Sequence, residues 1–113
     1  MYIAMNRFTV AAQNEQEFEA LWIGRDSQLN TLPGFVEFHM LKGPEENGLR
    51  LYSSHTVWAN KANFEAWTKS EQFRKAHARA GNDRPLNILG HPEFEGFEVV
   101  LHEDGAARRT AAE

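Results

Sequence analysis

Polar and apolar residues alternate along the first ten residues of the chain. Period two predicts a strand over residues 2–10 with two faces: Tyr2, Ala4, Asn6, Phe8 and Val10 on one, and Ile3, Met5, Arg7 and Thr9 on the other. Asn6 is the only polar residue in the first set. Because an unpaired buried amide costs about 1–3 kcal/mol, Asn6 either pairs with backbone in the core or extends its amide into a ligand site.

Apolar residues then return at helical spacing. Asn14 and Glu17 resemble a capping box that opens a helix. One face of this helix carries Phe18, Leu21, Trp22, Arg25 and Leu29. Arg25, the charged residue in the stripe, either lies along the edge of the core or presents its planar donors to a carboxylate. Pro33-Gly34 ends the segment.

The middle of the chain predicts a hairpin and a second helical region. Strands over 35–42 and 49–58 flank the turn-rich stretch GPEENG. Asn60 is the expected N-cap of a helix carrying Phe64 and Trp67, and Ser70 is the expected N-cap of another helical stretch that ends at Gly81.

Residues 82–93 contain two prolines and predict a long loop. A final strand follows over 94–102, in which Gly96 marks a bulge or a close approach. One domain is expected over residues 1–103, with a disordered tail over 104–113.

The order β-α-β-β-α-β predicts an α+β fold of the ferredoxin-like, split βαβ type. Its antiparallel sheet would carry both helices on one face. We expect Tyr2, Phe8, Phe35 and Leu51 to supply apolar surface for the packing of two sheets, which makes a homodimer, a dimeric α/β barrel.

Composition narrows the function. The net charge of −4 and a pI near 5.7, without a cluster of basic residues, argue against a nucleic-acid partner. The chain has no cysteine, which excludes disulfides and thiolate chemistry and fits a reducing cytoplasm. No signal peptide or membrane span is expected, and no G-x-S-x-G, G-x-G-x-x-G or P-loop motif is present.

Trp67 and His77 carry the most informative spacing. They lie ten residues apart, so on an unbroken helix their side chains would not converge. A break at 68–70 would let two segments present them to one cleft, or would make only a kinked amphipathic pair. His77 lies among apolar residues and is either a core histidine or a ligand. No histidine pair has zinc spacing, whereas haem iron needs a single axial histidine.

Four motifs connect these residues to a known family. They are Asn6-Arg7-Phe8, Pro33-Gly34-Phe35, Thr56-Val57-Trp58 and F-x-x-W-x-x-S-x-x-F-x-x-A-H from Phe64 to His77. In these motifs the chain resembles the antibiotic biosynthesis monooxygenase (ABM) superfamily, and within it the IsdG-type haem-degrading monooxygenases, over about residues 3–102.

The resemblance implies a site and a reaction. His77 would bind the haem iron, Asn6 would donate a hydrogen bond to the distal ligand, and Trp67 would distort the macrocycle. Arg25 would contact a propionate, and Trp22 would form a wall of the pocket. Haem would be both substrate and oxygen-activating cofactor of this oxidoreductase. With O2 and electrons from an external donor such as a reductase, the porphyrin would open and release iron and a linear tetrapyrrole.

Two alternatives stay open at this point. One is a cofactor-independent monooxygenase of the same superfamily acting on a quinol or phenol, a group that typically lacks the helix histidine found here at His77. The other is a haem-binding protein that does not turn its ligand over.

Overall fold

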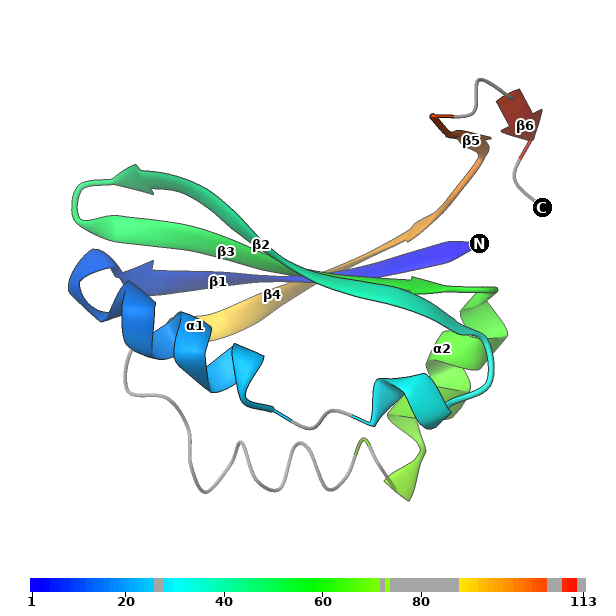
Figure 1. Cartoon of the computed structure of the whole chain (residues 1–113), viewed down its shortest axis with the longest axis horizontal. Helices are drawn as coiled ribbons and strands as arrows, with labels where there is room; N and C mark the ends of the chain where they lie inside the picture. The colour runs from blue at the N-terminus through cyan, green and yellow to red at the C-terminus, as the bar shows by residue number, and fades with distance from the viewer. Residues whose placement is uncertain (26–27, 72, 74–87, 106–108, 112–113) are drawn as a thin grey trace.

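A computed structural model describes residues 1–25, 28–71, 73, 88–105 and 109–111 of the 113-residue chain. Its strands are β1 (Tyr2–Ala11), β2 (Phe35–Glu46), β3 (Leu49–Trp58), β4 (Ile88–Glu98), β5 (Leu101–Glu103) and β6 (Arg109–Ala111). Its helices are α1 (Glu15–Ile23) and α2 (Lys61–Thr68), with 3-10 turns η1 (Ala12–Asn14) and η2 (Leu29–Thr31). Figure 1 shows their arrangement.

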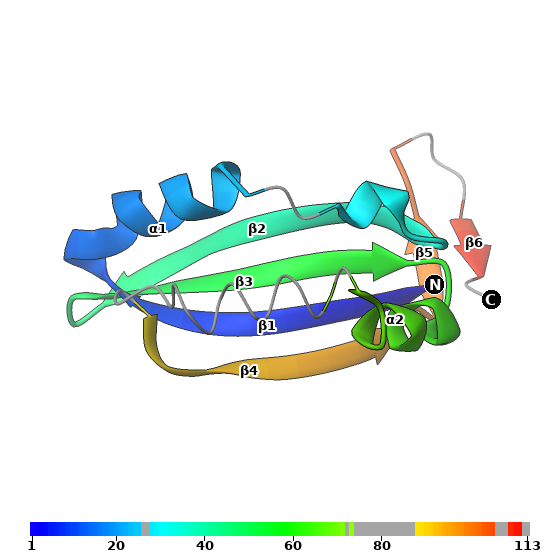
Figure 2. The same ribbon diagram turned by 90° about the horizontal axis from the view of Figure 1, so that it is seen from below.

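The main sheet has four strands in the order β2-β3-β1-β4, and every neighbouring pair is antiparallel. This order is that of the split βαβ fold, so the predicted fold class is confirmed. Both helices lie on one face of the sheet, and no helix that the structure describes covers the opposite face (Figures 1 and 2). A site on the helix side of the sheet is therefore bounded by α1 at one end and α2 at the other.

The predicted alternation in β1 is confirmed. Tyr2, Ala4, Phe8 and Val10 are all buried, and Asn6 between them is half-buried. The buried residues divide into two clusters rather than one. The first, under α2, contains Tyr2, Ala4, Leu29 and Trp58; the second, under α1, contains Phe8, Val10, Phe18 and Tyr52.

The first helix is shorter than its apolar stripe predicts. α1 ends at Ile23, and Leu29 is buried in η2 instead of continuing the helix. Asn14 is the N-cap residue but makes no side-chain capping bond, so the predicted capping box does not form. Gly24, the C-cap residue, follows at once and has low helix propensity, which favours the early end.

Two caps in the second helical region are confirmed. The Asn63 N–H donates to Asn60 Oδ1 at 2.8 Å, and the Phe73 N–H donates to Ser70 Oγ at 3.1 Å. α2 ends at Thr68, so the break predicted over 68–70 is present. Each cap satisfies an N–H group that a helix start leaves unpaired.

The prediction of a loop through residue 93 is wrong at its end, because β4 already begins at Ile88. Pro92 is compatible with this strand because β4 is an edge strand. The pairing of β1 with β4 shifts between Arg7 and Thr9, so the irregularity is not at Gly96. Gly96 marks a close approach, since a β-carbon there would overlap the Tyr2 hydroxyl.

The residues predicted to cover the outer face are partly wrong. Tyr2 and Phe8 are core residues on the helix side, and Phe35 packs against the same core. Leu51, opposite Thr9, does lie on the open face. That face carries Ile3, Leu41, Leu51, Val57 and Phe97, together with the pair Arg7–Glu95 at 2.8 Å.

Beyond the main sheet, β5 and β6 pair with each other. β6 lies in the segment 104–113, for which disorder was predicted, and Arg109–Ala111 are strand residues there. None of the helices described in the structure is long and apolar enough to cross a membrane.

Candidate functional site

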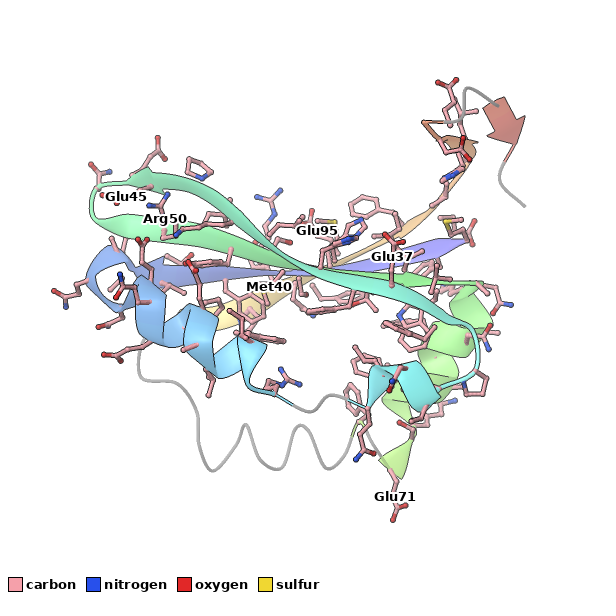
Figure 3. All side chains as sticks on the ribbon, in the orientation of Figure 1. Glu37, Met40, Glu45, Arg50, Glu71 and Glu95 are labelled. Atoms are coloured by element: carbon pink, nitrogen blue, oxygen red, sulfur yellow. The ribbon has the colours of Figure 1, made fainter. Side chains whose placement is uncertain are left out.

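A row of four side chains crosses the helix side of the sheet between the two clusters. Strand register places Met40, Ser54, Asn6 and Phe94 directly beside one another on β2, β3, β1 and β4. Met40 is labelled in Figure 3 and lies on the helix side, whereas Glu37 and Glu95 lie on the other. Two of these four side chains, Ser54 and Asn6, are polar, so the apolar floor is interrupted where the clusters separate.

The side-chain amide of Asn6 is available to bind a ligand. Its side chain is half-buried, and its amide makes no hydrogen bond with any residue that the structure describes. Its backbone N–H donates to Ser54 Oγ at 3.1 Å. Buried amides normally have hydrogen-bond partners. The sequence left open that the Asn6 side chain pairs with the backbone in the core, and no described residue makes that bond.

Aromatic rings under α1 form one wall beside this row. The Trp22 ring lies edge-on to Phe8, with centroids 5.7 Å apart, and stacks on Phe38 at 6.0 Å with 15° between the planes. The guanidinium carbon of Arg25 lies 4.2 Å from the centre of the Trp22 ring. Arg25 therefore stands at the edge of the wall, with its charge on an aromatic face.

Charged side chains hold α1, and with it this wall, against the sheet. Glu15 pairs with Arg50 of β3 at 2.8 Å, and Glu19 pairs with Lys42 of β2 at 2.8 Å. The buried Tyr52 donates its hydroxyl to Glu19. Arg50 is labelled in Figure 3 near the turn between β2 and β3.

These contacts shift the pKa values of the groups involved. Hydrogen bonds from Lys42 and Tyr52 hold the pKa of Glu19 below its usual value of 4.5. Burial, and then the bond to Glu19, raises the pKa of Tyr52 well above 10.0. Glu19 raises the pKa of Lys42, and Glu15 raises that of Arg50. All four groups thus keep their usual ionisation near neutral pH.

Trp67 belongs to the opposite wall, under α2. Its ring lies 5.7 Å from Trp58 and 6.2 Å from Phe64, and Phe73 meets it edge-on at 4.8 Å. Phe73 reaches this position because the helix breaks before Ser70, whose hydroxyl donates to the Trp67 carbonyl at 2.6 Å. The break thus brings Phe73 onto the Trp67 ring.

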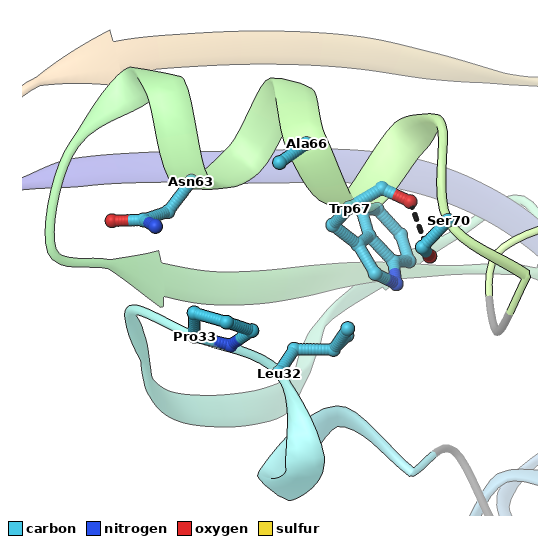
Figure 4. Close-up of a pocket in the computed structure, with 6 residues that line it drawn as sticks. All are labelled: Leu32, Pro33, Asn63, Ala66, Trp67 and Ser70. Atoms are coloured by element: carbon cyan, nitrogen blue, oxygen red, sulfur yellow. Dashed lines mark hydrogen bonds between the residues drawn. The ribbon is translucent and has the colours of Figure 1, made fainter.

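A cavity of about 180 Å³ borders Trp67 on the side of η2. Figure 4 shows its lining residues, which are Leu32, Pro33, Asn63, Ala66, Trp67 and Ser70. Ligand sites for drug-sized molecules are usually larger, on the order of 300–1,000 Å³. A macrocycle therefore does not fit this cavity alone.

The sequence-predicted residues fall into three groups. Trp22 and Arg25 lie on one wall, Trp67 lies on the other, and Asn6 lies on the floor between them. His77 lies outside the described residues, so its place in the site stays a prediction. Within the described part of the chain, no three His, Asp or Glu side chains form a group able to hold a metal ion.

Sequence reasoning missed Ser54 and Phe38. Ser54 lies on the same face of β3 as Tyr52, and it could have been assigned to the Asn6 face only with the pairing register of β1 and β3. Phe38 follows a register shift between Phe35 and Glu37, which strict alternation does not anticipate.

Comparison with known families gives one match over most of the chain. The family described as antibiotic biosynthesis monooxygenase matches residues 1–79. A haem-degrading monooxygenase of Shouchella clausii is 44% identical over 68 residues, which are 59% of this chain and 63% of that protein. A staphylobilin-producing haem oxygenase of Staphylococcus haemolyticus is 30% identical over 77 residues, 68% of this chain and 73% of that protein.

A solved structure resembles the whole arrangement. MhuD, a haem degrader of Mycobacterium tuberculosis whose structure holds two haems in its active site, aligns with a TM-score of 0.70. The alignment has 26% identity and covers 92% of this chain and 100% of that one.

Proposed function

Because the chain belongs to the antibiotic biosynthesis monooxygenase family, we propose that it is a haem-degrading monooxygenase. Haem is its substrate, and O2 and an external electron donor are its co-reactants. The products are iron and an open-chain tetrapyrrole. A cytoplasmic location belongs to the same proposal.

One observation carries this proposal beyond family membership. Asn6 lies between two aromatic clusters with its side-chain amide unpaired among the described residues, and Ser54 is the polar residue beside it. A flat apolar macrocycle with a polar ligand on its metal needs aromatic surfaces at its faces and a donor at one point. The relatives that degrade haem support the same choice of substrate.

Each site residue then has a role. His77 is the protein's axial ligand to the substrate iron. Asn6 donates a hydrogen bond to the ligand on the opposite side of the iron, where partial negative charge is stabilised by a fixed donor. The Trp67 indole, supported by Trp58 and Phe73, presses on the macrocycle and favours its out-of-plane form.

The other wall binds and orients the substrate. Trp22 covers an edge of the macrocycle, and Arg25 pairs with a propionate, which charge-assisted donors recognise well. The aromatic walls exclude water from the reacting centre, which strengthens the hydrogen bond from Asn6.

Titration with hemin tests the proposal. Purified protein should form a complex with a Soret band, and His77→Ala should lose it. His102→Ala is the matched control, because His102 is an exposed histidine on β5. Absence of the band from the unsubstituted protein would overturn the assignment and favour a cofactor-independent monooxygenase.

Turnover separates an enzyme from a carrier. With ascorbate or a reductase under air, the Soret band should decay, a ferrous-iron chelator should register iron, and mass analysis should identify the linear tetrapyrrole. A band that persists under these conditions would show haem binding without degradation. Asn6→Ala should keep the band and lose the decay.

The proposal includes a homodimer formed through the open face of the sheet. Leu41 and Phe97 on that face are 43% and 49% exposed, so a second copy would bury large apolar side chains. Sedimentation equilibrium should give twice the monomer mass, and Phe97→Glu should shift it to the monomer. Val100→Glu is the control, because Val100 is exposed but lies outside the main sheet.

A further inference from the structure

Apart from aromatic side chains that carry a polar group, Ser54 is the one polar residue that is buried in the part of the chain that the structure describes. It lies in β3 at 6% exposure, where β-branched and aromatic residues are the usual choice. A buried hydroxyl costs free energy unless hydrogen bonds replace those it made with water. The partners of Ser54 are therefore informative.

Within the described residues the Ser54 hydroxyl is used as an acceptor and not as a donor. Ser54 Oγ accepts the Asn6 backbone N–H at 3.1 Å, and no described residue accepts the proton of the Ser54 hydroxyl. On the same rung, the Asn6 side chain has a carbonyl oxygen with no described donor. An unused donor and an unused acceptor thus lie next to each other on one face of the sheet.

A free amide is a poor catalytic donor because its oxygen and nitrogen can exchange places by a half-turn of the side chain. A donor that binds the oxygen removes this ambiguity and leaves the NH2 group directed elsewhere. The orientation of the Asn6 NH2 group matters, because a donor that is already aimed at the distal ligand stabilises charge there without a cost of reorganisation.

We propose that Ser54 is a positioning residue: when haem is bound, its hydroxyl donates to Asn6 Oδ1 and holds the Asn6 NH2 toward the distal ligand. This inference rests on the proposed function and adds to it the group that orients the donor. Ser54 does not touch the substrate. Its neighbour Ser53 faces the open side of the sheet and cannot perform this role.

The experiment uses the haem complex of the full chain and two ligands that report on distal hydrogen bonding. Azide binding to the ferric complex should weaken roughly fivefold in Ser54→Ala, the effect of losing about one hydrogen bond. In the ferrous carbon monoxide complex, the C–O stretch should split or move toward the frequency of Asn6→Ala. Ser54→Thr, which keeps the hydroxyl, should restore both readings, and Ser53→Ala should leave both unchanged.

The outcomes separate this inference from the proposed function. If the unsubstituted protein binds no haem, the proposed function fails. If haem binds and Asn6→Ala moves the C–O stretch but Ser54→Ala does not, the role of Ser54 is overturned while the function stands. A Ser54→Thr protein that behaves like Ser54→Ala would likewise overturn it, because loss of packing and not of the hydroxyl would then explain the change.

Discussion

The hydroxyl of Tyr2 occupies the space that a β-carbon on Gly96 would need. The two residues lie on neighbouring strands, because Gly96 pairs with Ala4, two residues from Tyr2 along the same face. We therefore expect Gly96→Ala to lower the free energy of unfolding by about 1–3 kcal/mol, the usual cost of overpacking. Urea unfolding followed by fluorescence measures the change.

The matched control for this substitution is Tyr2→Phe in the same chain. Removing the hydroxyl takes away the nearest atom but leaves the ring carbon Cζ 2.8 Å from the β-carbon position, so the double variant should regain only part of the stability lost in Gly96→Ala. Additive losses in the double variant would mean that another contact limits residue 96.

Arg25, on the face of Trp22, is predicted to recognise a carboxylate of the substrate. Arg25→Ala should weaken hemin binding roughly tenfold, the effect of one charge-assisted hydrogen bond. Hemin dimethyl ester, which lacks the free carboxylates, should bind Arg25→Ala and the unsubstituted protein alike. Equal weakening for both ligands would assign the effect to packing against Trp22 instead.

The pKa of Glu19 predicts how the free energy of unfolding changes at acidic pH. Its pKa is lower in the folded protein than its usual 4.5, so its ionised form stabilises the fold. That contribution is present above pH 4.5 and is lost as the pH falls through the folded pKa. Glu19→Gln should be less stable than the unsubstituted protein at pH 7, and the difference should shrink below pH 4.5.

Denaturant unfolding between pH 3 and pH 7 measures this difference. Glu17→Gln, an exposed change on the same helix, is the control and should show little difference at any pH. A gap between Glu19→Gln and the unsubstituted protein that stays constant with pH would show that the hydrogen bond to Tyr52, and not the charge, carries the effect.

Trp67→Phe tests the role of the larger indole ring. The smaller ring keeps an aromatic surface, so hemin affinity should stay within a few-fold, whereas the rate of degradation should fall roughly tenfold if distortion contributes. Resonance Raman bands of out-of-plane macrocycle modes should weaken in parallel. Trp22→Phe, on the other wall, should leave those bands unchanged; an unaltered rate in Trp67→Phe would exclude the proposed role.

Local chemistry made much of the fold predictable. Alternation in β1 identified its buried face because every second side chain of a strand points the same way. Asn60 and Ser70 marked helix starts because their side chains accept backbone N–H groups there. The end of α1 was missed because Leu29 keeps helical spacing with Trp22 and Arg25 although the chain has already left the helix.

The site was predictable only in part for a related reason. Asn6 stood out as a polar residue in an apolar row, and Trp67 stood out in its motif. Ser54 did not, because its proximity to Asn6 depends on register between strands far apart in sequence. The outer face was partly misassigned because aromatic residues such as Tyr2 and Phe8 are equally suited to either side of a sheet before helix positions are known.

The division of the buried residues into two clusters affects how the molecule responds to its ligand. Each helix packs on its own buried cluster, and among the described residues the two clusters are joined by the sheet and by the stack of Trp22 on Phe38. Local opening at one end can therefore occur without loss of packing at the other. Amide hydrogen exchange in α1 and α2 should accordingly differ in rate in the free protein, and a ligand that touches both walls should make the two helices exchange as one cooperative unit.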